Sequence, residues 1–279
     1  MSGPADTDPT RGAWPGAVGR PVDRRHFLRT GLAAGIAVTA SCGNPFGDDD
    51  DRGSSRLRTR LAGPRRSIAP GVHDLFPDTG VEGGLCVPSD YDPSVPVPLI
   101  VMLHGYGSSR DVIDNLFPLA ETRGMLMVTP RSRGITWDMV RNRFGPDVER
   151  LDRVLAYTFE RCAVDPTAVV LAGFSDGGTY ALSLGLDNGD LFTHIIGYSP
   201  GFLAPLRPRG EPRIYIAHGT NDTVLRIDQT SRVIVPRLED MGYDVTYNEF
   251  EGIHAVYLSI VSESFVWVRP ERPEVDADA

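Results

Sequence analysis

The stretch G-F-S-D-G-G (residues 173–178) decides the fold of this chain. It follows an apolar run, A-V-V-L-A (168–172), and precedes a run of small residues and leucine, T-Y-A-L-S-L-G-L (179–186). This order predicts a buried strand, a tight turn and a helix, which is the context in which G-x-S-x-G forms a nucleophile elbow. Glycine is needed at 173 and 177 because the strained turn brings the backbones too close for a Cβ. Ser175 is the candidate nucleophile; the alternative is a glycine-rich turn without a chemical role.

Short β-rich runs alternate with longer amphipathic runs on both sides of this turn, from about residue 72 to 268. Several of the β-rich runs are almost continuously apolar, as in strands that are buried on both faces. We expect strands at 83–87, 98–104, 125–129, 168–174, 194–198, 213–218 and 245–250, and helices at 147–161, 227–241 and 255–268. This alternation predicts an α/β fold with a mostly parallel central sheet and helices on both faces.

A nucleophilic serine needs a base, and in this type of fold the acid and the histidine follow the serine in that order. The histidines after Ser175 are His194, His218 and His254. His194 begins a predicted strand, which favours a packed histidine, and His218 ends one, which favours a ring that braces the following loop. His254 lies in E-G-I-H-A-V, between the last strand and the last helix, and is the predicted catalytic base.

The acid that orients this histidine is expected just past the end of a strand. Asp222 lies there, in H-G-T-N-D (218–222), and is the predicted third member of the triad. Asp228, at the start of the predicted helix that follows, is the second candidate.

A further turn, H-G-Y-G-S-S (104–109), follows the strand predicted at 98–104. Such a turn leaves backbone N–H groups free, so the predicted oxyanion hole consists of the amides of Tyr106 and Asp176, the residue after the nucleophile. We expect the side chain of His104 to tie this loop down. Trp137, in the long loop 131–145, is predicted to form a wall of the substrate site; a local packing anchor is the alternative.

These motifs together resemble those of the α/β-hydrolase esterases of the phospholipase/carboxylesterase group, relatives of polyhydroxybutyrate-depolymerase-like and feruloyl-esterase-like enzymes. The resemblance rests on H-G-Y-G, G-F-S-D-G-G, H-G-T-N-D and E-G-x-H, in that order, and covers about residues 72–268. It implies the α/β-hydrolase fold, hydrolysis of carboxylic esters through an acyl-enzyme, and neither metal nor organic cofactor. Residues 200–212 leave no room for a large helical cap, so we expect an open site for short- to medium-chain or polymer-borne esters.

Two other functions are compatible with the same motifs. A peptidase or an acyltransferase would use the same triad, and a non-catalytic binding protein would keep the scaffold without the reaction.

The N-terminal residues 1–42 are predicted to be an export signal with a possible lipobox. Arg24 and Arg25 precede a short, weakly apolar run, as in a twin-arginine signal, and this run is too short to span a bilayer. T-A-S-C-G (39–43) resembles a lipobox, which would make Cys42 the lipidated first residue of the mature chain; ordinary cleavage after Ala40 is the alternative. Residues 43–71 are predicted to be a disordered linker and residues 269–279 a disordered tail.

Composition and charge exclude further classes of function. The net charge is −9 and no basic stripe is present, which argues against nucleic acid as a partner. The chain has 3 cysteines without metal-ligand spacing. Cys86 and Cys162 are expected to be unpaired, small buried side chains.

Overall fold

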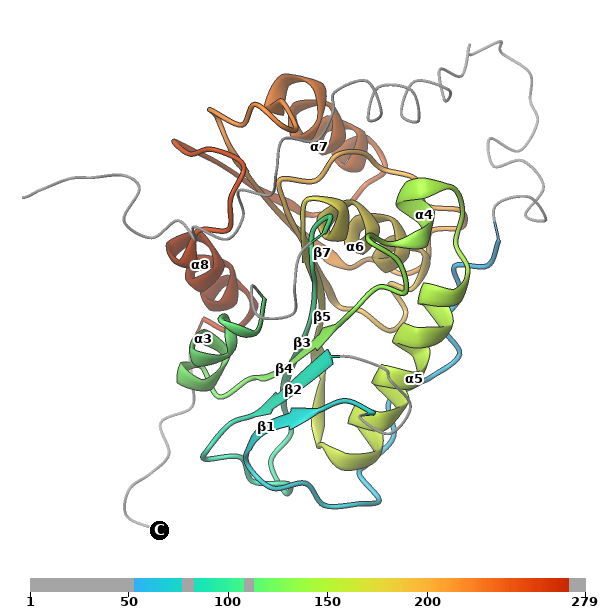
Figure 1. Ribbon diagram of the computed structural model, residues 1–279, viewed down its shortest axis with the longest axis vertical. Helices are drawn as coiled ribbons and strands as arrows, with labels where there is room; N and C mark the ends of the chain where they lie inside the picture. The colour runs from blue at the N-terminus through green and yellow to red at the C-terminus, as the bar shows by residue number, and fades with distance from the viewer. Residues whose placement is uncertain (1–52, 77–82, 108–112, 271–279) are drawn as a thin grey trace, which may run out of the picture.

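The β-rich runs form one 8-stranded sheet in the order β1-β2-β4-β3-β5-β6-β7-β8. The computed structural model describes residues 53–76, 83–107 and 113–270, so the predicted signal, lipobox and nearly all of the C-terminal tail lie outside the described residues (Figure 1). The strands are β1 (Gly71–Asp74), β2 (Gly83–Val87), β3 (Val97–Leu103), β4 (Leu126–Pro130), β5 (Val164–Phe174), β6 (His194–Tyr198), β7 (Arg213–Gly219) and β8 (Val245–Phe250). From β4 to β8 neighbouring strands are parallel, whereas β2 is antiparallel to both β1 and β4.

Helices cover both faces of the sheet (Figure 1). They are α3 (Phe117–Thr122), α4 (Asp138–Arg141), α5 (Pro146–Arg161), α6 (Asp176–Asp187), η5 (Ile227–Gln229), α7 (Ser231–Asp240) and α8 (Leu258–Val268). Because side chains alternate along a strand, Leu99, Val101 and Leu103 of β3 pack with α5 and α6, while Ile100 and Met102 pack with α3 and α8. The predicted fold class is confirmed.

The predicted elements differ from the observed ones mainly at short or exposed segments. Strand β1 was not predicted; it is short and its residues are largely exposed, so it carries no apolar signature. Strand β5 begins at Val164 because Val97 pairs with that residue before the register shifts. The helix predicted at 227–241 is interrupted at Thr230, whose backbone (φ −128°, ψ −95°) is not helical.

The predicted linker at 43–71 is wrong for residues 53–70, which we call the strap. The strap runs along α5 in an extended conformation (Figure 1). Leu57 is fully buried in the core, and its N–H donates to Asn188 Oδ1 over 3.0 Å. The carboxylate of Asp152 accepts two further strap N–H groups at 2.8 and 2.7 Å. The polar composition of this segment predicted disorder. The segment is ordered because side chains of α5 and of the end of α6 accept hydrogen bonds from its backbone N–H groups.

Two sequence expectations about the domain hold. Cys86 and Cys162 are free and buried, and burial raises the pKa of their thiols to about 11 and about 12. Between β6 and β7 the described chain contains no helix, so no helical cap is inserted there.

No helix among the described residues is both long and apolar enough to cross a membrane.

Candidate functional site

Ser175 lies on the turn between β5 and α6, at the carboxyl edge of the parallel strands. Its φ of 56° and ψ of −118° are strained for a residue with a Cβ, as expected for a nucleophile elbow. A Cβ on Gly173 would lie 2.2 Å from Gly177 O, and one on Gly177 would lie 2.4 Å from Leu103 O. The strained turn therefore requires both glycines, and the N–H of Ser175 holds it by donating to Tyr198 O over 2.8 Å.

The structure brings Ser175, His254 and Asp222 into one hydrogen-bonded chain. His254 Nε2 lies 2.9 Å from Ser175 Oγ, and His254 Nδ1 lies 2.6 Å from Asp222 Oδ2. Because an ionised carboxylate only accepts hydrogen bonds, Nδ1–H donates to Asp222 and Nε2 is left to accept from the serine hydroxyl. The ring of His254 also contacts that of Phe174, with 4.8 Å between centroids.

Asp222 is held as a buried carboxylate by four N–H donors. Its Oδ1 accepts from the amides of Val224 and Leu225, both at 2.8 Å. Its Oδ2 accepts from His254 and lies 3.2 Å from His218 Nε2. Burial by itself would raise the pKa of Asp222, but the hydrogen bonds from these donors hold it well below its usual value. Asp222 is therefore ionised at neutral pH, as an orienting acid must be.

The loop after β3 passes directly beside the serine. A Cβ built on Gly105 would lie 3.3 Å from Ser175 Cβ. The amides of Tyr106 and of Asp176, the first residue of α6, make no hydrogen bond to another described residue. Both amides are therefore available to an anion at this position, and the positive end of the α6 dipole adds to the attraction.

His104 ties this loop down as predicted. Its Nδ1 lies 2.8 Å from Gly105 O, and its Nε2 accepts from the amide of Ser132 over 3.0 Å.

The prediction of Trp137 as a substrate wall is wrong. Its side chain is fully buried, its indole N–H donates to His104 O over 2.8 Å, and its ring packs between those of His104 and Tyr180. A fully buried ring offers no surface to a substrate. Trp137 is instead the packing anchor that positions the loop after β3.

Asp228 and His194, which the sequence also offered as an acid and a histidine after Ser175, lie away from the three hydrogen-bonded residues. Asp228 is exposed and pairs with Arg226 at 3.0 Å, whereas the acid next to His254 is Asp222. His194 is a packed residue whose ring meets that of Trp267 edge to face, and burial lowers its pKa to about 4.

Sequence reasoning missed several residues that support the site. Thr136 Oγ1 donates to Asp176 Oδ2 over 2.6 Å and so joins the 131–145 loop to the nucleophile turn. His218 Nε2 lies 2.8 Å from Leu225 O, which can only accept, so Nε2–H donates there and also faces Asp222, while Ser231 Oγ lies 2.7 Å from His218 Nδ1. No motif marks these residues, since each contact joins segments that are distant in sequence.

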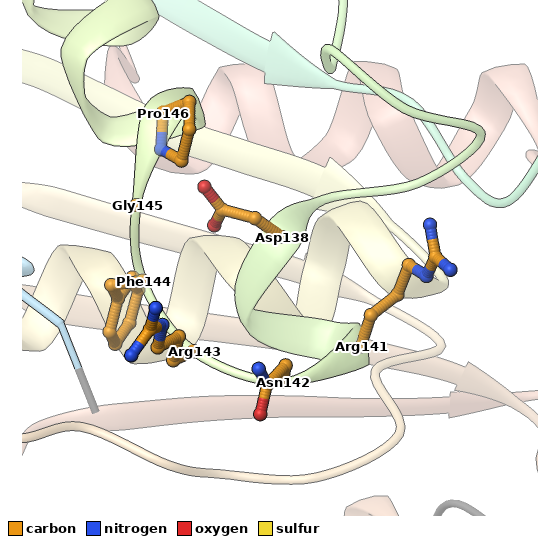
Figure 2. A pocket seen from close by; sticks show the side chains of 7 residues that line it. All are labelled: Asp138, Arg141, Asn142, Arg143, Phe144, Gly145 and Pro146. Carbon is orange, nitrogen blue, oxygen red and sulfur yellow. The ribbon is translucent and has the colours of Figure 1, made fainter. Parts of the chain in front are cut away.

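A separate cavity of about 360 Å³ lies on the loop between β4 and α5 (Figure 2). It is lined by Asp138, Arg141, Asn142, Arg143, Phe144, Gly145 and Pro146, so it contains none of the three hydrogen-bonded site residues. Asp138 points into it, while its carboxylate accepts from the amide of Asp147 over 2.8 Å (Figure 2). No group of His, Cys, Asp or Glu side chains within the described ranges could hold a metal ion.

Fold and site together define an α/β-hydrolase scaffold with a serine, a histidine and an aspartate at its carboxyl edge. No protein-family model matches the chain. Feruloyl esterase C of Emericella nidulans is 29% identical over 175 residues, which cover 60% of this chain and 63% of that enzyme. The match therefore spans less than two thirds of that relative.

Solved structures show the same fold. The chain resembles the esterase PE8 (TM-score 0.55, 19% identity) over 68% of this chain and 98% of that one. It also resembles a ferulic acid esterase of Anaeromyces mucronatus in complex with ferulic acid (TM-score 0.54, 19% identity) over 76% of this chain and 93% of that one. At these identities the likeness establishes the fold, and the resemblance drawn from the motifs is confirmed to that extent.

Proposed function

We propose that this chain is a serine hydrolase that cleaves carboxylic esters through an acyl-enzyme intermediate. The observation that carries the proposal is the chain of hydrogen bonds from Ser175 Oγ through His254 to Asp222, beside the amides of Tyr106 and Asp176, which donate to no other described residue. The similarity to a feruloyl esterase supports ester hydrolysis over other reactions of this fold.

The reaction follows from this geometry. Ser175 Oγ attacks the ester carbonyl carbon while His254 Nε2 takes the hydroxyl proton. The negative oxygen of the tetrahedral intermediate accepts from the amides of Tyr106 and Asp176. The bond to the alkoxy oxygen then breaks, and His254 returns the proton to the leaving alcohol. Water then attacks the acyl carbon while His254 Nε2 takes its proton. The bond from this carbon to Ser175 Oγ breaks, the ring returns the proton to Oγ, and the acid leaves.

The substrate that we propose is a short- to medium-chain or polymer-borne ester. The absence of a helix between β6 and β7 in the described chain supports an open site that admits bulky esters. A profile of acyl chain length should therefore peak below about ten carbons, and it should show no interfacial activation on long-chain emulsions.

The triad is tested with Ser175→Ala. A fluorophosphonate probe should label the wild-type protein, peptide mapping should place the label on Ser175, and Ser175→Ala should be folded, unlabelled and inactive on 4-nitrophenyl butyrate. Matched amide and acyl-acceptor substrates separate esterase from peptidase and acyltransferase. Full ester turnover by folded Ser175→Ala would overturn the assignment.

We also propose that the protein is exported and anchored by lipid on Cys42, on the strength of the sequence signals alone. Arg24→Lys combined with Arg25→Lys should retain the protein in the cytoplasm, since a twin-arginine signal needs both arginines. Normal export of that variant would point to the general secretory route.

A further inference from the structure

Large exposed apolar side chains lie in the loops at the edge of the sheet that carries Ser175. Isolated ones are ordinary on a protein surface, but a group of them at one place marks a binding site. Tyr106, Ile135, Phe202, Val224 and Ile253 all lie in loops that follow the carboxyl ends of the strands. Val224 and Ile253 are 61% and 54% exposed and are the two that flank the acid and the base.

Val224 and Ile253 are fixed on the His254 side of the site. The amide of Val224 donates to Asp222 Oδ1, and the other oxygen of that carboxylate accepts from His254. Ile253 directly precedes His254 in the chain. Asn221 N–H donates to Gly252 O over 2.9 Å, and this bond joins the two loops that carry the apolar side chains.

The reaction places one half of the ester on that side. In the tetrahedral intermediate the oxyanion faces the amides of Tyr106 and Asp176, and the leaving oxygen must lie within reach of His254 Nε2, which protonates it. The alcohol half therefore leaves past His254, toward the loops that carry Val224 and Ile253.

We propose that Val224 and Ile253 form a binding wall for the alcohol half of the ester, and that this alcohol is an uncharged alkyl or aryl group. The proposal rests on the proposed ester hydrolysis and adds the class of leaving group.

The charges of the two loops agree with an uncharged alcohol. Residues 219–225 and 250–256 contain no arginine or lysine, and their acidic residues are Asp222 and the exposed Glu251. An anionic alcohol would meet these carboxylates, and the two loops supply no cation of their own, so its esters should be poor substrates.

The experiment measures kcat/KM for butyrate esters of alcohols from ethanol to hexanol, and for ethyl esters of acids of increasing length. The ratio kcat/KM depends on the steps up to and including acylation, during which the alcohol is still bound. It therefore responds to the length of the alcohol even where deacylation limits kcat. For the wild type we expect a rise of about two- to four-fold per methylene of the alcohol, the upper value corresponding to full burial of a CH₂.

The variant pair Val224→Thr with Ile253→Thr keeps β-branched shapes and the backbone amides but makes the wall polar. We expect it to lose more than half of the slope of log kcat/KM against alcohol length while keeping the slope against acyl length. Val233→Thr is the matched control, since Val233 is 57% exposed on α7 and lies outside these loops; it should behave as the wild type.

An unchanged alcohol slope in the double variant, a wild type indifferent to alcohol length, or a change confined to the acyl slope would overturn the proposal. Fluorophosphonate labelling of Ser175 in the variant verifies that the site is assembled. If the wild type is neither labelled nor active on any ester, the proposed function itself fails.

Discussion

Leu57→Ala tests the docking of the strap, the feature that departs most from the sequence-based expectation. Leu57 is fully buried among side chains of the core that α5 and α6 form with the sheet. Replacing a buried leucine with alanine costs about 2–5 kcal/mol, depending on how far the site collapses. The strap can also detach locally, which limits the loss to its own docking free energy, so we expect a decrease of about 2–4 kcal/mol in the free energy of unfolding.

Urea denaturation followed by circular dichroism measures this loss. Limited proteolysis with trypsin gives a local readout, because the strap contains Arg56, Arg58, Arg60, Arg65 and Arg66. Cleavage at these arginines should accelerate in Leu57→Ala. The matched control is Leu61→Ala, since Leu61 is half-buried against the same core and should lose less stability.

A loss below about 0.5 kcal/mol for Leu57→Ala would refute docking of the strap, because that is the range of an ordinary surface substitution. Unchanged proteolysis would have the same meaning. The predicted linker would then extend as far as β1.

Three other predictions follow. Asp222→Asn should lower kcat on 4-nitrophenyl butyrate by about 10³–10⁴-fold, because the amide favours the wrong tautomer of His254, while Asp228→Asn should stay within about two-fold; the reverse ranking would move the acid role. The buried His194, with its pKa lowered to about 4, takes up a proton on unfolding between pH 6.5 and 4, so stability falls as pH falls through this window. His194 should account for about 2 kcal/mol of the loss from pH 7 to 5, so urea denaturation at both pH values should give a loss smaller by that amount in His194→Gln; parallel pH dependences would exclude this contribution. Cys42→Ala should release the protein to the medium, and mass spectrometry of the native N-terminus should find a diacylglycerol adduct; an unmodified N-terminus would remove the anchor.

The parts of the site that could be predicted are those with a local chemical constraint. The turn around Ser175 needs glycine on both sides of the serine, and its strand and helix are recognisable from composition alone. His254 and Asp222 were found because loops at the carboxyl ends of parallel strands converge at one edge of the sheet. The buried strands carried a clear apolar signal for the same reason that they form the core.

The rest depends on contacts between distant segments. An indole at position 137 in a loop gives no sign that it packs between His104 and Tyr180, so its burial could not be predicted. The strap has few apolar residues, and its order depends on the Asp152 carboxylate and the Asn188 side chain far along the chain. Short or exposed elements such as β1 lack a periodic signal altogether.

The docked strap changes what a lipid on Cys42 would mean for the site. Gly53 abuts Phe144, where a Cβ would lie 1.8 Å from the carbonyl oxygen, so the strap begins beside the loop that follows the carboxyl end of β4. Ser175 lies at the same edge of the sheet. Covalent geometry limits the distance from Cys42 to Gly53 to about 40 Å, against about 100 Å for a linker that reaches residue 71. An anchor at Cys42 would therefore attach to the protein near the edge that carries the site, and it would keep Gly53 within about 40 Å of the membrane surface.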